Sequence, residues 1–90
     1  MRLNELAKLL KTAGEENRLK ILCVIFDKKD TCVSDISREL KISVASCSHH
    51  LQTMSKEGLI ISKRVGKNIY YQLPKNVFTN DLKKFICKYR

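Results

Sequence analysis

Four cysteines and two adjacent histidines are the residues of this 90-residue chain best suited to chemistry. They are Cys23, Cys32, Cys47, Cys87, His49 and His50. Thiolates bind soft metal ions and exchange with disulfides or polysulfides, whereas imidazoles bind metals, move protons or contact nucleic acid. No Gly-rich phosphate loop or paired-carboxylate motif accompanies them. We therefore expect a protein that is not an enzyme.

Positive charge is concentrated in the second part of the chain. Lys and Arg number 18 against 9 Asp and Glu, a net charge of +9. Residues 1–40 hold eight basic and seven acidic side chains, whereas residues 41–90 hold ten basic and two acidic ones. Clustered Lys and Arg suit nucleic acid or an anionic membrane surface, because they release counterions from phosphates. A basic face that is only solvated would have the same composition. The choice between a binding surface and a solvated face therefore depends on the elements that position these charges.

The composition favours one compact cytoplasmic domain. Apolar residues make up 43% of the chain, with three glycines and one proline, and 90 residues leave room for a single core. The longest apolar run, residues 21–26, is far shorter than the roughly 20 residues that cross a bilayer. Glu5 stands where a signal peptide would begin its apolar core. We expect no membrane association and reduced thiols.

Apolar residues at helical spacing predict three helices in the first 40 residues. The first helix covers residues 2–13, and the second covers residues 16–27. A short third helix is marked by Val33, Ile36 and Leu40. The polar run 27–30 between the second and third helices indicates a loop.

A fourth helix follows after a short turn. Ser43 is a suitable N-cap, and the helix runs to Gly58. The inward stripe of this helix is Cys47, Leu51 and Met54. The outward face carries Val44, Ala45, Ser48, His49 and Gln52. Two helices joined by so short a turn form a helix-turn-helix motif.

After Gly58 the pattern becomes strand-like. Residues 59–65 and 69–73 are rich in β-branched and aromatic side chains, and residues 66–68 supply a turn, so we expect a β-hairpin with a basic tip. A last helix covers about residues 76–89. The order α-α-α-α-β-β-α is mainly α with a small β-hairpin, a winged helix-turn-helix. In such a domain the helix at 43–57, the recognition helix, enters the major groove, and the hairpin at 62–68, the wing, lies against the DNA backbone or minor groove.

Five stretches carry a family resemblance. They are Asn17-Arg18-Leu19-Lys20-Ile21-Leu22, Cys32-Val33-Ser34-Asp35-Ile36, Ser48-His49-His50-Leu51, Glu57-Gly58-Leu59-Ile60 and Gly66-Lys67-Asn68-Ile69-Tyr70-Tyr71-Gln72-Leu73. In this order and spacing the chain resembles the ArsR/SmtB family of bacterial and archaeal repressors. The resemblance implies a single DNA-binding domain over residues 1–90 and a homodimer built through terminal helices 1–13 and 76–90. It also implies that the dimer binds a palindromic double-stranded DNA operator and that an effector releases the protein from this DNA.

The resemblance also implies which residues contact DNA. Ser48 and His49 match the base- and backbone-contacting positions of the family, and Ser46 adds a phosphate contact near the helix N-terminus. Val44 and Ala45, at the start of the same helix, can touch a thymine methyl group but cannot form a bidentate bond to a purine. The expected DNA-binding residues are Val44, Ala45, Ser46, Ser48, His49, Gln52, Lys63, Arg64 and Lys67.

For the effector, the chain is most similar to the persulfide- and redox-sensing branch of the family (BigR, SqrR and HlyU type). Cys23 and Cys87 match the two reactive cysteines of that branch, which a disulfide or polysulfide joins, and nearby lysines would favour the thiolate. Alternatively, Cys23 is a small buried hydrophobe and the protein has no effector. Cys47, on the inward stripe, is expected in the core.

A metal-responsive repressor is a further alternative. Metal-sensing relatives often carry two cysteines around a valine at the start of the third helix, and here the second position is Ser34. The last helix offers only Asp81 and Cys87 in place of a zinc set, so we expect no metal cofactor. A mixed site using Cys32 and Asp35 stays open, as does an effector-independent winged helix that binds DNA, RNA or a protein.

Overall fold

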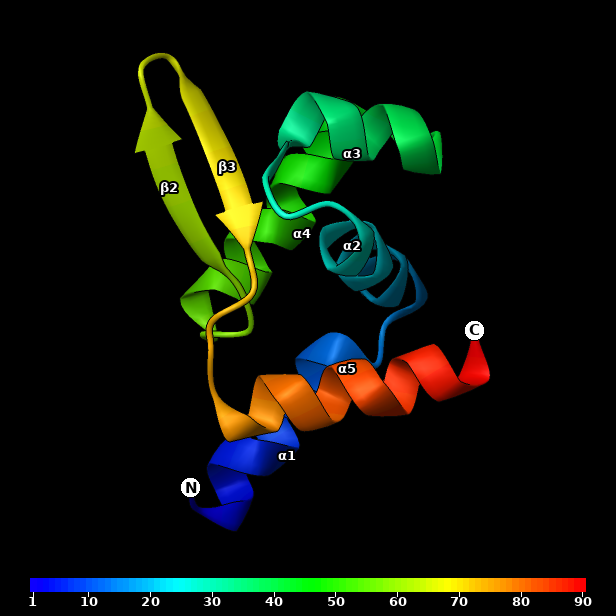
Figure 1. Cartoon of the computed structure of the whole chain (residues 1–90), viewed down its shortest axis with the longest axis vertical. Coiled ribbons are helices and arrows are strands. Elements are labelled where there is room, and N and C mark those ends of the chain that lie inside the picture. The colour runs from blue at the N-terminus through cyan, green and yellow to red at the C-terminus, as the bar shows by residue number, and fades with distance from the viewer.

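The structure, a computed structural model, describes residues 1–90 as five helices and three short strands (Figure 1). Their bounds are α1 Leu3–Ala13, α2 Glu16–Asp27, β1 Thr31–Cys32, α3 Val33–Leu40, α4 Val44–Lys56, β2 Ile61–Val65, β3 Asn68–Gln72 and α5 Val77–Tyr89. The predicted winged helix-turn-helix is confirmed, with one strand more than expected. None of the helices combines the length and apolar character needed to cross a bilayer.

The helix-turn-helix consists of α3 and α4. Lys41 ends α3 in the left-handed region at a φ of 57°. Ser43 caps α4, because its Oγ accepts a hydrogen bond of 3.0 Å from the backbone N–H of Ser46. The predicted range of 43–57 is therefore one residue too long at each end, since Ser43 and Glu57 are the two caps.

The wing is an antiparallel hairpin of β2 and β3. Val65 pairs with Asn68, so the loop has only two residues, and Gly66 opens it at a φ of 62°. The predicted first strand began too early. Leu59 and Ile60 are buried in the core, and the strand begins only at Ile61.

A third strand, β1, was not expected. Thr31 pairs with Tyr71 and Cys32 with Tyr70, which makes the hairpin a three-stranded sheet in the order β1-β3-β2. Because β1 directly precedes α3, this pairing ties the base of the wing to the helix-turn-helix. The tip of the wing has no such tie.

The core is formed mainly by α2 and α4, with contributions from their neighbours. Its buried apolar residues are Ala13, Ile21, Leu22, Val24, Ile25, Ile36, Cys47, Leu51, Met54, Leu59 and Ile60. Helix α5 packs Phe78, Leu82 and Ile86 against this core. It begins at Val77 rather than 76, because Asn76 is the N-cap and accepts a bond of 2.8 Å from the N–H of Thr79.

The terminal helices leave much of their apolar surface uncovered. Leu3 of α1 is 82% exposed, and Phe85 of α5 is 63% exposed. Leu10, Val77 and Tyr89 are exposed as well. Helices α1 and α5 are both at the end of the molecule away from the tip of the hairpin (Figure 1). The wing and the uncovered apolar faces are thus at opposite ends.

Candidate nucleic-acid interface

Helix α4 presents two chemically different faces. Cys47, Leu51 and Met54 are fully buried, as their spacing predicted. On the outer side, Val44, Ala45, His49 and Gln52 are exposed, whereas Ser46 and Ser48 are half-buried. No carboxylate occurs anywhere in α4. The outer face can therefore meet an anionic surface without charge repulsion from its own helix.

The two histidines of α4 lie in different environments. His49 is exposed, and neither of its ring nitrogens is hydrogen bonded within the chain. The side chain of His50 is only 15% exposed, and its Nδ1 lies 4.0 Å from Oε2 of Glu15, the N-cap of α2. His49 is thus available to an external partner, while His50 packs between helices.

The wing supplies free positive charge. Lys63 pairs across the hairpin with Tyr70, and Arg64 pairs with Ile69. Because successive side chains of a strand alternate, these two cations occupy opposite faces of the hairpin. Lys67 lies in the two-residue loop at the tip. All three are exposed, none takes part in an ion pair, and residues 61–75 contain no carboxylate.

The four cysteines are all free thiols in different settings. Cys47 is fully buried, and burial raises the pKa of its thiol to about 11. Cys32 is half-buried, and Cys87 is exposed. Cys47 therefore lacks the thiolate needed for reaction near neutral pH.

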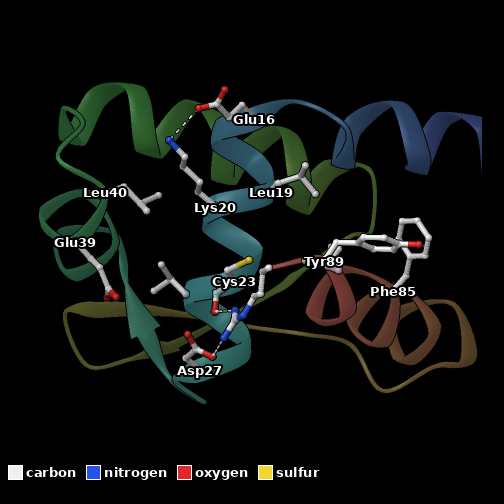
Figure 2. A pocket seen from close by; sticks show the side chains of 12 residues that line it. Glu16, Leu19, Lys20, Cys23, Asp27, Glu39, Leu40, Phe85 and Tyr89 are labelled. Atoms are coloured by element: carbon white, nitrogen blue, oxygen red, sulfur yellow. Dashed lines mark hydrogen bonds and ion pairs between the residues drawn. The ribbon is translucent and has the colours of Figure 1, made fainter.

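Cys23 faces a cavity of about 730 Å³ between α2 and α5 (Figure 2). Phe85 and Tyr89 border this cavity on one side and Leu40 on another. The guanidinium of Arg90 donates a hydrogen bond of 3.3 Å to the carbonyl oxygen of Cys23. Half-buried but open to a sizeable cavity, this thiol is within reach of a small molecule.

Cys87 does not line that cavity. The α5 residues that do are Phe85, Ile86 and Tyr89, followed by Arg90. Cys87 is one helical turn after Lys83 and shares its face of α5. The structure thus brings both cysteines to the α2–α5 region without directing them into the same space.

Cys32 and Asp35 lie together at the start of α3. The Sγ of Cys32 donates to Oδ2 of Asp35 over 3.3 Å, and Nη1 of Arg38 donates to Oδ1 of the same carboxylate, also over 3.3 Å. No group of three or more His, Cys, Asp or Glu side chains converges where it could hold a metal ion. The pair offers two ligands, and a tight transition-metal site needs three or four.

Sequence reasoning missed three features of this region. They are the β1 tether of the wing, the Glu15–His50 contact and the position of Arg90 beside Cys23. The polar run before Thr31 signalled a loop, and only the β-branched side chain of Thr31 hinted at a strand. The other two contacts join residues that are far apart in the sequence and left no local signal.

Comparison with known proteins gives the architecture a family context. The family model described as "Bacterial regulatory protein, arsR family" matches residues 15–62, more than half of the chain. The Listeria innocua cadmium resistance transcriptional regulatory protein CadC is 41% identical over 61 residues, which cover 68% of this chain and 51% of CadC. The chain thus spans about half the length of the first curated relatives that it matches.

Two further matches extend over almost the whole chain. The Escherichia coli HTH-type transcriptional regulator YgaV is 33% identical over 84 residues, covering 90% of this chain and 85% of YgaV. The structure of HlyU from Vibrio cholerae superposes with a TM-score of 0.85 at 26% identity, covering 96% of this chain and 92% of HlyU. The matches thus include both a cadmium resistance transcriptional regulatory protein and HlyU.

Proposed function

The chain belongs to the arsR family of bacterial regulatory proteins, and from this premise we propose that it is a cytoplasmic, dimeric, sequence-specific DNA-binding repressor. The proposed interface consists of the outer face of α4 and the wing. Val44, Ala45, Ser46, Ser48, His49 and Gln52 contact base edges and nearby phosphates, and Lys63, Arg64 and Lys67 contact the backbone.

One observation carries this proposal. From α4 through the end of the wing, every exposed charge is positive and the exposed imidazole of His49 has no partner within the chain. The phosphates of a DNA duplex supply the negative charge that this surface lacks. The hydroxyls of the half-buried Ser46 and Ser48 can donate hydrogen bonds to those phosphates.

The dimer is proposed from the uncovered faces of α1 and α5. Leu3, Phe85 and Tyr89 expose large apolar side chains that a second copy would cover. Two-fold symmetry would then present two copies of α4 about one DNA turn apart, which matches a palindromic operator.

DNA binding is tested by fluorescence anisotropy with the reduced protein. The probes are a duplex from upstream of its own gene, a scrambled duplex and a single-stranded RNA of equal length. The proposal expects the upstream duplex to bind at least about a thousandfold more tightly than the scrambled one. Equal binding of both duplexes, or preference for the RNA, would overturn it.

As the effector mechanism, we propose a thiol switch between Cys23 and Cys87. A polysulfide oxidises the two thiols, which become joined through one or more sulfur atoms, and the polysulfide is reduced to shorter species and sulfide. Because Cys87 does not line the cavity that Cys23 faces, we expect the link between them to reorient the end of α5. That movement would change the dimer and weaken DNA binding.

The switch is tested with the variants C23S, C87S and C32S. Polysulfide should lower the operator affinity of the wild type and of C32S, but not of C23S or C87S, and mass analysis should find the Cys23 and Cys87 peptides linked. If polysulfide lowers the operator affinity of all three variants alike, the switch is contradicted.

A metal-responsive repressor is the second candidate, because Cys32 already contacts Asp35 over 3.3 Å. It predicts that cadmium releases DNA from the wild type and that C32S abolishes the response. Unchanged DNA binding in cadmium would exclude it.

A further inference from the structure

A second cavity, distinct from the one at Cys23, lies between the end of α2, the end of β3 and the first half of α5. Its volume is about 430 Å³, within the usual range for small-molecule sites. The segment that joins β3 to α5, visible in Figure 1, supplies part of its lining. The cavity therefore adjoins the base of the wing and one of the terminal helices.

Three lysines surround this cavity, one from each element or connection. They are Lys29 after α2, Lys75 before α5 and Lys83 within α5. None forms an ion pair within the chain. The only carboxylate in the lining, that of Asp30, already accepts a hydrogen bond from the side-chain amide of Gln72. The cavity thus carries three positive charges against the single negative charge of Asp30 and keeps an excess of positive charge.

The rest of the lining combines apolar surface with neutral polar groups. Phe26 and Leu73 pack against the core, and the ammonium of Lys83 lies 5.9 Å from the centre of the Phe26 ring. Asn80 and the side-chain hydroxyl of Thr79 make no side-chain hydrogen bond within the chain. A ligand with an anionic head group and an apolar body would match this lining. Its head group would meet the lysines and the amide of Asn80, and its apolar body would meet the ring of Phe26.

We propose that this cavity binds a small organic anion, a phosphate monoester or carboxylate attached to an apolar group. The lysines hold the head group, Asn80 and Thr79 orient it, and Phe26 and Leu73 receive the apolar part. Binding at this site does not depend on the proposed DNA-binding function.

The test uses phenyl phosphate in a ¹H–¹⁵N NMR titration of the whole chain at constant ionic strength. Saturable shifts are expected at Leu73, Thr79 and Asn80. The triple variant K29Q/K75Q/K83Q should raise the apparent Kd at least about tenfold, which is the effect expected from the loss of one charged hydrogen bond.

A matched control is K11Q/K84Q/K88Q, which removes the same charge from lysines outside the cavity. Its lost cation–π contact, Lys88 over Tyr89, parallels that of Lys83. The control should bind as tightly as the wild type. Shifts that do not saturate, or equal weakening in both triple variants, would overturn the site.

An effect on DNA rests on the proposed function and is measured separately. Because the cavity includes residues of both the wing base and α5, its occupation should change operator affinity by about fivefold or more. Binding of phenyl phosphate without any change would overturn the coupling and leave the site standing. A protein that binds no DNA would overturn the proposed function, and the NMR titration would still decide the site.

Discussion

The Nδ1 atom of His50 lies 4.0 Å from Oε2 of Glu15, so the recognition helix α4 meets the residue that caps α2. The same Oε2 accepts a hydrogen bond of 2.9 Å from the N–H of Arg18. The side chain of Arg18 in turn donates to the carbonyl oxygen of Thr12 in α1. Glu15 and Arg18 therefore lie between the proposed DNA-binding helix and the terminal helix α1.

This arrangement predicts a pH-dependent contribution to stability from Glu15. Burial raises the pKa of Glu15, but hydrogen bonds from the N–H groups of Arg18 and Asn17 and the charges of His50 and Arg18 hold it below its ordinary value of 4.5. The stabilisation is thus fully present above that value and is lost as the pH falls through the lower, folded-state pKa. Urea unfolding between pH 3 and 7 should show a steeper acid loss in the wild type than in E15Q. Parallel curves would contradict the assignment.

The thiols should differ in reactivity according to their burial. Iodoacetamide at pH 8 should label exposed Cys87 first and Cys47 last, because burial raises the pKa of Cys47 to about 11. Time-resolved mass analysis of the native protein checks the order. Labelling of Cys47 as fast as Cys87 would mean that α4 does not protect it.

The wing should contribute sequence-independent affinity. The variant K63Q/R64Q/K67Q should bind operator and random duplex more weakly by similar factors, and each lost phosphate contact should reduce the salt slope by about 0.9. Salt titrations by anisotropy measure both effects. K11Q/K84Q/K88Q, with the same change in net charge, should retain most of the slope, and a slope equal to that of the wing variant would show only a net-charge effect.

His49 should act differently from the wing. H49A should lose discrimination between operator and scrambled duplex, by about 1–3 kcal/mol, more than it loses overall affinity, because a base contact carries sequence information. Competition titrations with the two duplexes measure the difference. Equal losses on both would assign His49 to the backbone instead.

The exposed apolar face of α5 should hold the dimer together. F85E places a charge on a side chain that is 63% exposed in the single chain and should shift the protein toward monomer without unfolding it. Sedimentation velocity and circular dichroism test both parts. N80E, which introduces the same charge at an exposed position on the opposite side of α5 from Phe85, is a control. An unchanged dimer in F85E would place the interface elsewhere.

The sequence was sufficient for the elements whose pattern is local. The stripe of Cys47, Leu51 and Met54 and the capping residue Ser43 specified α4 almost to the residue. Strand β1 could not be predicted in the same way, because two residues have no periodicity and Thr31–Cys32 become a strand only by pairing with Tyr70 and Tyr71. Leu59 and Ile60 have β-branched or aliphatic side chains typical of strands, but burial in the core kept them out of the hairpin.

The same limit applies to the candidate site. The outward positions of α4 follow from helical spacing alone, and the structure places them outward or half-buried. The contacts of His50 with Glu15 and of Arg90 with Cys23 depend on how helices pack, which no spacing within a helix specifies. The cavity with Lys29, Lys75 and Lys83 likewise exists only after three separate segments meet.

A ¹H–¹⁵N NMR titration of the reduced protein with the duplex from upstream of its gene tests the proposed DNA interface most directly. We expect the largest shifts on the outer face of α4, at Ser46, Ser48, His49 and Gln52, and on the wing at residues 63–67. Shifts confined to α1 and α5, with α4 and the wing unchanged, would contradict it.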